Sequence, residues 1–405
     1  MIDHADVVVV GAGGLGAATA FHLAKRGDLS VALLDKHAIG SQTSPRAAGM
    51  VSCLRKSDLM ITLIKRACQQ IERFTEETGQ PLDWVLSGSL KVARRSQDAE
   101  VLAADRQRGR RMGLDVEQIT AAEAHRLNPF LQTQGVEAVL RIGDDRYFNP
   151  AQVAVGFAVA AQAWGAALLP NTDVTRVDIE RDAVVGVQTT WGTIRASVLV
   201  DAAGAWTRQV AEASGIRVPL VPTRLQLIVT EPQAGVRADL PMVRIMDAAV
   251  YMRPCEGGLL WGVYEEEPRF FDMNAFPSDF DVKDLPLDAA VLRAAAEEVR
   301  AQLPVLRVAK ARELRGGLPT MTADGQHILG PSPALRGFYF ASGCNVAGLS
   351  IAPAVGEALA MWIAEGQPPT DLSPLSVARF RDASWPEDQL RKEAAWQYRH
   401  FYGAV

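Results

Sequence analysis

Three glycines near the start of the chain have the spacing of a dinucleotide-binding turn. Gly11, Gly13 and Gly16 form G-x-G-x-x-G directly after four valines, and Asp35 follows about 20 residues later. In such a turn the first glycine permits the bend, the second lets a diphosphate approach the backbone, and the following helix offers N–H groups and positive potential. A carboxylate at Asp35 accepts hydrogen bonds from ribose hydroxyls and disfavours a 2′-phosphate. The sequence therefore predicts a dinucleotide site.

The elements expected around these glycines make the pattern specific. Residues 7–10 are valines, which suit a strand buried on both faces of a parallel sheet. Residues 17–25 carry small and apolar side chains at helical spacing, and a second buried strand over 31–34 ends at Asp35. Strand, turn, helix and strand form one βαβ unit, whereas glycines in unrelated turns lack these neighbours.

Later segments are expected to complete the fold. A single helix is predicted over about 58–78, where a simple nicotinamide dehydrogenase would continue with further βαβ units. A buried strand over 198–202 runs into small residues and indicates a return to the nucleotide-binding unit. Alternating runs over 219–264 predict an antiparallel sheet, and a glycine-bearing loop over 343–350 precedes a helix, as a second cofactor contact would.

The end of the chain predicts one more helix. It opens at Pro386 and carries Leu390, Ala394, Tyr398 and Phe401 on one stripe. We expect this stripe to dock on the chain's own domain or on a partner.

Composition excludes several classes of protein. The 42 lysines and arginines are outnumbered by 47 aspartates and glutamates, so no nucleic acid partner is expected. The four cysteines are scattered and predict neither a zinc site nor a disulfide framework, and no metal site is expected. The N-terminus lacks the basic start of a secretory signal, and glycines interrupt the apolar run over 7–24. We therefore expect no membrane span and a cytoplasmic location.

The ordered set of motifs resembles the flavoprotein half of sarcosine and dimethylglycine dehydrogenases, within the D-amino-acid-oxidase-like superfamily. The resemblance runs nearly end to end. Besides the glycine turn, it rests on Ala47-Ala48-Gly49-Met50, Glu76-Glu77-Thr78-Gly79, Gly88-Ser89-Leu90, Asp201-Ala202-Ala203-Gly204-Ala205-Trp206, Tyr251-Met252-Arg253-Pro254, Gly257-Gly258-Leu259-Leu260-Trp261-Gly262 and the loop from Gly343 to Gly348. The family implies bound FAD and oxidation of a C–H next to an amine nitrogen, with hydride passing to flavin N5 and hydrolysis of the resulting imine.

Three departures from the family pattern shape our expectations. Pro45 and Arg46 stand where the family carries the histidine that links to the flavin, so FAD is expected to bind non-covalently. Leu225 stands where the family has a second histidine near the substrate amine, which leaves the sarcosine or dimethylglycine assignment and the catalytic base open. The folate-binding module that follows the flavoprotein half is absent from the sequence, so formaldehyde from an oxidised methyl group would be released.

The resemblance implies an α/β fold in two parts. We expect a Rossmann-like FAD-binding domain of the glutathione-reductase type, built from residues 1–84, 146–218 and 311–405. A second domain with an antiparallel sheet, residues 85–145 and 219–310, is expected to bind the substrate.

The candidate site residues follow from the motifs. The expected cofactor-binding residues are Gly11, Ala12, Gly13, Gly14, Leu15, Gly16, Asp35, Lys36, Ser44, Arg46, Ala47, Ala48, Gly49, Met50, Val174, Ala203, Gly204, Trp206, Gly343, Gly348, Leu349 and Ser350. Tyr251 is the candidate catalytic residue, as an acceptor that favours the neutral amine. The candidate substrate-binding residues are Arg46, Arg55, Arg253 and Asn345. An arginine fork suits a substrate carboxylate, and strand alternation places Tyr251 and Arg253 on one face.

Several alternatives stay open at this point. The substrate could be an N-methyl amino acid, a cyclic imino acid such as proline or hydroxyproline, or an opine-like secondary amine. Electrons could pass to oxygen, a quinone or an electron-transfer protein, and the chain could form homo- or hetero-oligomers. A flavin monooxygenase or hydroxy-acid oxidase uses the same nucleotide fold. A partner-dependent flavin subunit of a hetero-oligomeric amino acid or opine dehydrogenase is a further alternative.

Overall fold

The computed structural model describes residues 2–381 and 385–403, and a six-stranded sheet holds the glycine turn. In spatial order its strands are β21 (Ile328–Pro331), β22 (Phe338–Ser342), β13 (Val198–Asp201), β1 (Val7–Val10), β2 (Val31–Leu34) and β9 (Ala167–Leu169). All neighbours pair in parallel except β21 and β22. The predicted βαβ unit and the returning strand are therefore confirmed.

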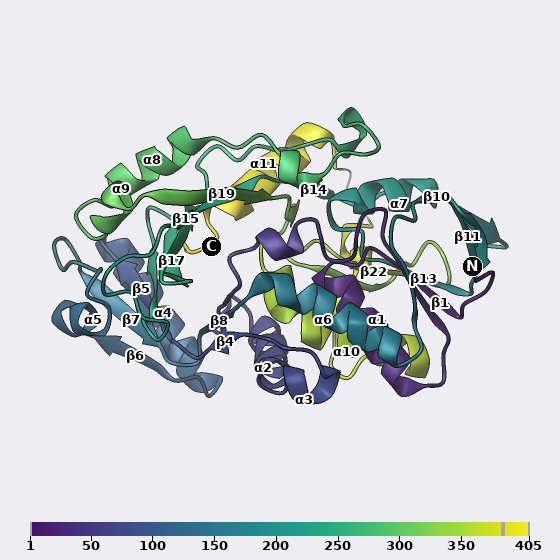
Figure 1. Cartoon of the computed structure of the whole chain (residues 1–405), viewed down its shortest axis with the longest axis horizontal. Coiled ribbons are helices and arrows are strands. Elements are labelled where there is room, and N and C mark those ends of the chain that lie inside the picture. The colour runs from purple at the N-terminus through teal and green to yellow at the C-terminus, as the bar shows by residue number, and fades with distance from the viewer. Residues whose placement is uncertain (1, 382–384, 404–405) are drawn as a thin grey trace.

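Three helices pack together against this sheet. They are α1 (Gly14–Arg26), α6 (Pro150–Ala163) and α10 (Gly348–Glu365), and Figure 1 shows them grouped below the strands. Small residues make the close packing of α1 and α10 possible, because a Cβ on Gly356 would lie only 2.5 Å from the backbone of Ala18. Burying small residues between two helices lets their backbones approach closely, which holds their N-termini side by side.

An eight-stranded sheet forms the other half of the molecule in Figure 1. Its order is β19 (Ala311–Gly317), β15 (Leu225–Thr230), β18 (Gly258–Val263), β17 (Val250–Cys255), β16 (Met242–Ile245), β5 (Ser89–Ala93), β7 (Ala138–Ile142) and β6 (Val116–Ile119). Every pair is antiparallel except β16 with β5. The antiparallel sheet predicted over 219–264 is thus present and extends to strands from both sides in the sequence.

Smaller elements connect and flank these sheets. Three small sheets consist of β3 (Met50–Val51), β8 (Arg146–Phe148) and β4 (Trp84–Val85); β10 (Val174–Glu180), β11 (Ala183–Thr189) and β12 (Gly192–Arg195); and β14 (Leu220–Pro222) with β20 (Thr320–Thr322). The remaining α-helices are α2 (Asp58–Glu72), α3 (Phe74–Thr78), α4 (Ser96–Arg111), α5 (Ala121–Leu127), α7 (Thr207–Ala213), α8 (Ala289–Glu298), α9 (Val305–Val308) and α11 (Glu387–Arg399). Short 3₁₀ turns are η1 (Ser44–Arg46), η2 (Gly204–Trp206), η3 (Met273–Ala275), η4 (Val282–Asp284), η5 (Ser373–Leu375) and η6 (Val377–Phe380).

The prediction of one continuous helix over 58–78 is wrong. It breaks at Arg73, whose φ of −101° and ψ of 10° end α2 before α3 begins. The break turns Phe74 into the core, where its ring lies 4.8 Å from that of Phe157. Burial of this aromatic side chain outweighs the loss of helical regularity.

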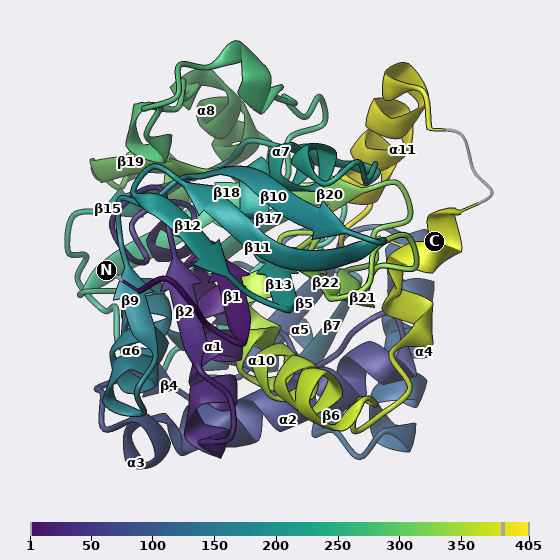
Figure 2. The same ribbon diagram turned by 90° about the vertical axis from the view of Figure 1, so that its right-hand side faces the viewer.

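The last helix docks on the chain itself. Figure 2 shows α11 beside β20, and it also contacts β14. Leu390, Ala394 and Tyr398 are buried, as the sequence stripe predicts, and the Tyr398 hydroxyl donates to the Arg224 carbonyl at 2.9 Å. No helix among the described residues is both long and apolar enough to cross a bilayer.

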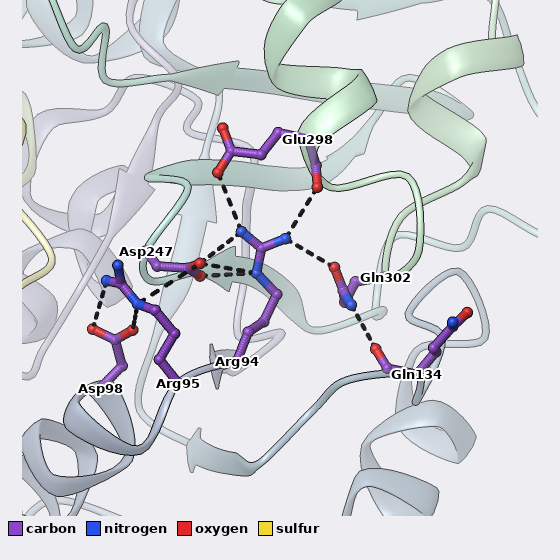
Figure 3. A network of polar contacts seen from close by, with 7 residues as sticks. All are labelled: Arg94, Arg95, Asp98, Gln134, Asp247, Glu298 and Gln302. Carbon is purple, nitrogen blue, oxygen red and sulfur yellow. Dashed lines mark hydrogen bonds and ion pairs between the residues drawn. The ribbon is translucent and has the colours of Figure 1, made fainter.

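An arginine-centred network holds the eight-stranded sheet to α8 (Figure 3). Arg94, just after β5, donates to both carboxylate oxygens of Asp247 at 2.7–3.2 Å. It also reaches the Glu298 carbonyl and the Gln302 side chain, each at 3.1 Å. Charge-assisted, bidentate hydrogen bonds of this kind are among the strongest polar contacts in proteins. The network therefore fixes the end of α8 against the turn between β16 and β17.

Candidate functional site

A cavity of about 400 Å³ is lined by residues of both large sheets. Its size falls in the range of roughly 300–1,000 Å³ that is typical of small-molecule sites. It is bordered by the start of α1, the start of α10, the turn at 44–50, and strands β15, β16 and β17. The cavity thus joins the glycine turn to the second sheet.

Each glycine of the turn is needed at its position for a different steric reason. Gly11 has a φ of 100°, and a Cβ there would collide with the Ala202 carbonyl oxygen, while a Cβ on Gly16 would collide with the Gly11 carbonyl. Gly13 differs, because a Cβ at this position would meet only the Ser44 Oγ, at 3.2 Å, and Gly13 lines the cavity. The outer glycines pack the helix onto the strand, and the middle one opens backbone to a ligand.

Two helix N-termini meet at this cavity. Gly13, Gly14 and Leu15 of α1 line it together with Gly348, Leu349 and Ser350 of α10. Neither helix is capped by the side chain of its own N-cap residue, and neither has an acidic residue in its first turn. Both ends therefore present backbone N–H groups and positive potential that no carboxylate of the first turn neutralises, as the diphosphate and the reduced ring of a flavin nucleotide require.

Asp35 lies at one end of the cavity and is held by backbone donors. Its two carboxylate oxygens accept from the Ala12 and His37 amides, each at 2.8 Å. Burial nevertheless raises the pKa of Asp35 to about 6. Trp206 lines the same cavity, and the Lys36 ammonium lies 5.1 Å from its ring centroid. An acidic acceptor beside an aromatic wall suits an adenosine ribose.

The 3₁₀ turn η1 and the residues after it, 44–50, border the cavity. Ser44 Oγ accepts from the Gly14 amide at 3.0 Å, which ties the turn to the start of α1. Arg46 lines the cavity, and its Nε is buried without a hydrogen-bond partner among the described residues. Arg46 as a whole is half-buried, but a buried N–H donor without a partner costs free energy, so this atom indicates a polar ligand.

A second group of lining residues, which we call the substrate end, combines the arginines Arg55 and Arg244 with Tyr251. Arg55 donates from Nη2 to Ser350 Oγ at 3.1 Å, but its buried Nε has no partner among the described residues. Burial, followed by the charge of Arg244, lowers the pKa of Arg55 from its usual value. The Tyr251 hydroxyl is also buried and unpartnered in the described part of the chain, and burial raises the pKa of this phenol. These polar atoms fit a small anionic or polar substrate.

Most predicted site residues line this cavity, and five do not. The predicted residues outside its lining are Ala12, Gly16, Arg253, Gly343 and Asn345. Two of these five residues, Arg253 and Asn345, have structural roles instead.

Arg253 shares a strand face with Tyr251 but does not reach the cavity. It donates from Nε to the Ala48 carbonyl at 2.6 Å and covers the Tyr147 ring at 4.7 Å. Asn345 is buried and, with a φ of 40°, accepts from the Thr322 amide at 3.0 Å and donates to the Gly343 carbonyl at 2.7 Å. Arg253 thus connects β17 to the turn at 44–50, and Asn345 holds its own loop in place.

Sequence reasoning missed four residues at the substrate end. They are Arg244, Tyr264, Phe401 and Tyr402. Arg244 could have been found, because it is a lone arginine in the otherwise apolar strand Met242–Ile245. It pairs with the buried carboxylate of Asp145 at 2.9 Å and donates to Ser89 Oγ at 2.8 Å. The sequence stripe includes Phe401, but no local pattern shows that Phe401 and Tyr402 reach the cavity, because this depends on how α11 docks.

The cavity lining limits which side chains could form a covalent bond to a cofactor. No histidine of the described residues lines the cavity, whereas Pro45 and Arg46 occupy η1 as the sequence indicates. Cys344 does line it, and its Sγ accepts from the Thr320 amide at 3.3 Å.

The glycine turn, the paired helix N-termini and the second sheet beside them define a dinucleotide-binding enzyme with a separate substrate wall. The chain belongs to the DAO family of FAD-dependent oxidoreductases, whose profile matches residues 6–362. The resemblance found in the sequence motifs is therefore confirmed, as is the mixed α/β fold.

Individual relatives support the same assignment. Human mitochondrial sarcosine dehydrogenase is 32% identical over 408 residues, which cover 99% of this chain and 44% of that protein. Glycine oxidase of Geobacillus kaustophilus is 29% identical over 390 residues, which cover 94% of this chain and 98% of that protein. The crystal structure of L-proline dehydrogenase from P. horikoshii matches with a TM-score of 0.85 and 25% identity, over 95% of this chain and 100% of that one. The chain thus spans less than half of the sarcosine dehydrogenase.

Proposed function

We propose that this chain binds FAD and oxidises the C–H next to the nitrogen of an amino acid whose amine is secondary or tertiary, or part of a ring. The observation that carries the proposal is the set of unpartnered buried polar atoms on Arg46, Arg55 and Tyr251 in one cavity with two helix N-termini. The family and the name of the relative glycine oxidase agree with oxidation of an amino acid, and the names sarcosine dehydrogenase and L-proline dehydrogenase agree with a secondary amine.

The cofactor is held by groups that fit its charges. The start of α1 receives the diphosphate, Asp35 the ribose hydroxyls, and the start of α10 the end of the flavin that gains negative charge on reduction. Bound FAD supplies the hydride acceptor of the reaction. The protein's own task is to place the substrate beside it and to keep the amine unprotonated.

Arg55 is placed to bind the substrate carboxylate. Its guanidinium is anchored at one end by Ser350 Oγ, which leaves Nε to a ligand. Arg244 adds positive charge, while Asp145 neutralises part of it. The carboxylate of one substrate molecule then balances the remaining positive charge, so the site favours amino acids over simple amines.

Tyr251 is placed to orient the amine. Because burial raises the pKa of its phenol, the hydroxyl stays protonated at neutral pH. Its oxygen can accept a hydrogen bond from an amine N–H, or its O–H can donate one to the amine nitrogen. The arginines and the apolar wall disfavour an ammonium ion at the same place. A neutral amine, with its lone pair free, is the form that can release hydride.

We also propose that FAD is bound non-covalently. Support comes from Arg46 at the position of the family's linking histidine and from the lack of a cavity-lining histidine in the described residues. Acid precipitation of the yellow protein should leave the flavin in the supernatant. Flavin in the pellet would contradict the proposal, and a Cys344→Ser variant would then show whether the thiol forms the bond.

Anaerobic titration of the purified full chain tests the function. We expect sarcosine, other N-methyl amino acids or proline to bleach the flavin absorbance, and glycolate to leave it unchanged. Air is then admitted to one sample, and a quinone is added to a parallel anaerobic sample. The rates at which the flavin absorbance recovers in the two samples compare oxygen with the quinone as electron acceptor. Bleaching by glycolate alone would indicate a hydroxy-acid oxidase. A flavin that no amine reduces without a second protein would indicate a partner-dependent subunit.

A further inference from the structure

The chain returns to its own cavity after the last helix. α11 ends at Arg399, and Phe401 and Tyr402 then line the cavity together with Tyr251 and Tyr264. Four aromatic side chains, from strand β17, from the residue after β18 and from the C-terminal segment, therefore meet at the substrate end. The family profile ends at residue 362, so this segment lies outside the part that the profile matches.

Ring packing gives the segment a defined position. Tyr264 stacks on Phe401, with centroids 4.7 Å apart and planes at 25°, and meets Tyr402 edge-on at 5.2 Å. Phe401 and Tyr402 pack at 5.4 Å, and Tyr251 lies 5.8 Å from Tyr264. Aromatic pairs at these separations attract each other beyond simple burial.

Polar anchors hold the segment from both sides. The Tyr398 hydroxyl donates to the Arg224 carbonyl at 2.9 Å, and Lys56 Nζ donates to the His400 carbonyl at 2.8 Å. Lys56 directly follows Arg55, the residue assigned to the substrate carboxylate. The segment and the arginine are therefore fixed relative to each other.

The substrate end combines cationic and aromatic side chains, because Arg55, Arg244 and Tyr402 all line the cavity. Burial raises the pKa of Tyr402, and the charge of Arg244 opposes this rise. Arg55 and Arg244 suit a carboxylate, whereas the aromatic rings offer apolar faces at a short distance from it. An amino acid with carbon substituents on its nitrogen presents these two features together.

We infer that Phe401 and Tyr402 determine specificity by packing against the N-alkyl group of the substrate, a methyl group or the ring methylenes of a cyclic imino acid. This inference rests on the proposed function and assigns the residues that select its substrate class. A pocket wall that contacts a methylene typically discriminates about 10- to 200-fold against a ligand that lacks it. Primary amino acids leave the aromatic wall uncovered and are bound more weakly.

Binding of unreactive carboxylates tests the inference apart from turnover. The flavin absorbance of the holoenzyme is titrated with pyrrole-2-carboxylate, whose ring fills the aromatic side, and with acetate, which has no such group. We expect the full chain to bind pyrrole-2-carboxylate at least about tenfold more tightly. Phe401→Ala and Tyr402→Ala should remove most of this preference by weakening pyrrole-2-carboxylate and leaving acetate unchanged.

Two variants control the experiment. Tyr402→Phe keeps the ring and should keep the preference, and Trp191→Ala removes an aromatic side chain that is 62% exposed and does not line the cavity. FAD content and melting temperature are measured for every variant.

The outcomes separate the two proposals. An unchanged preference in the folded, FAD-containing alanine variants would overturn the inference, as would its loss in Tyr402→Phe. If the wild-type flavin is not reduced by any amine, the proposed function fails, and the carboxylate titrations still decide the role of the aromatic wall. Where turnover occurs, the ratio of kcat/KM for sarcosine over glycine should fall at least about tenfold in the alanine variants.

Discussion

Tyr251 places a hydroxyl group where the protein makes no use of it for folding. The group is buried at the cavity and has no partner among the described residues, and its ring packs against Gly262, where a Cβ would collide with the hydroxyl. A buried donor left unpaired costs about 1–3 kcal/mol, so such groups are retained when a ligand completes them.

We expect Tyr251→Phe to lower kcat/KM about 10- to 100-fold, because one hydrogen bond to the substrate amine is lost. The melting temperature should stay the same or rise slightly, because the substitution removes an unsatisfied group. Steady-state kinetics and thermal unfolding of the holoenzyme measure both effects. An unchanged kcat/KM would remove Tyr251 from the reaction.

Asp35 should make FAD binding depend on pH. Burial raises its pKa to about 6 in the free site, whereas hydrogen bonds from ribose hydroxyls favour the charged carboxylate and lower this pKa when FAD binds. Binding therefore releases a proton, and affinity should increase as pH rises through about 6. Fluorescence titration of the apoprotein between pH 5 and 8 measures this slope.

Asp35→Asn provides the control for this pH dependence. The amide keeps one oxygen acceptor but cannot ionise, so FAD should bind more weakly than to the wild type at pH 8, with little change between pH 5 and 8. A slope that persists in the variant would assign the titration to another group.

The residues of the site were predictable where a local backbone constraint identifies them. Gly11 and Gly16 cannot carry a Cβ, and this constraint is visible in sequence as the spacing of the glycines. Arg253 followed the predicted strand alternation, but its length lets it reach the Ala48 carbonyl instead of the cavity. Phe401 and Tyr402 depend on tertiary docking, which no pattern of nearby residues encodes.

Arg94 stabilises the junction of β5, the turn after β16 and the end of α8. Its side chain is 15% exposed and that of Asp247 is 11% exposed, so water replaces their hydrogen bonds poorly. Arg94→Gln should lower the free energy of unfolding by about 2–4 kcal/mol, because Asp247 is left without its bidentate partner. Chemical denaturation of the holoenzyme measures the change.

An exposed ion pair offers the matched comparison. Arg312 pairs with Glu256, and their side chains are 37% and 68% exposed. Arg312→Gln should cost at most about 1 kcal/mol, as surface pairs usually do. Equal losses in both variants would show that the network of Figure 3 adds nothing beyond an ordinary surface contact.

Elements were predicted well where one face of the chain has a clear period. The helix over 387–399 follows such a period, the strand over 198–202 was predicted from its continuous apolar run, and both are present. The break at Arg73 was not predicted, because the apolar stripe continues through it and only the packing of Phe74 on Phe157 favours the bend. The parallel pairing of β16 with β5 joins residues about 150 positions apart in the sequence, a contact that local spacing cannot specify.

At the scale of the whole molecule, Arg253 joins the second sheet to the cofactor turn. Its Nε–H binds the Ala48 carbonyl, and Ala48 itself lines the cavity. Arg253→Met should therefore weaken FAD binding and lower the stability of the holoenzyme by about 2–4 kcal/mol, because the buried carbonyl loses its charged donor. The dissociation constant of FAD and the melting temperature measure these effects.

The control is Arg237→Met, which removes an arginine whose side chain is 61% exposed. It should leave both quantities unchanged. If Arg253→Met behaves in the same way, the contact between β17 and the turn is not needed to position the cofactor.

We propose that the chain divides into an FAD-binding part, residues 1–84, 146–218 and 311–405, and a substrate-binding part, residues 85–145 and 219–310. The strands of the six-stranded sheet all come from the first set. Strand β19, Ala311–Gly317, begins at the proposed boundary and pairs with β15 of the eight-stranded sheet. Because the chain crosses between the parts several times, we expect the two to unfold together.

Trp206 has a consequence for how cofactor loading can be followed. The indole lines the same cavity as the glycine turn and lies beside Lys36. Flavins absorb near the wavelengths at which tryptophan emits, so the ring acts as a built-in optical reporter whose emission should dim as FAD enters. A variant with phenylalanine in its place would keep the other seven tryptophans, none of which lines the cavity in the described part of the chain, and should show a smaller loss of emission.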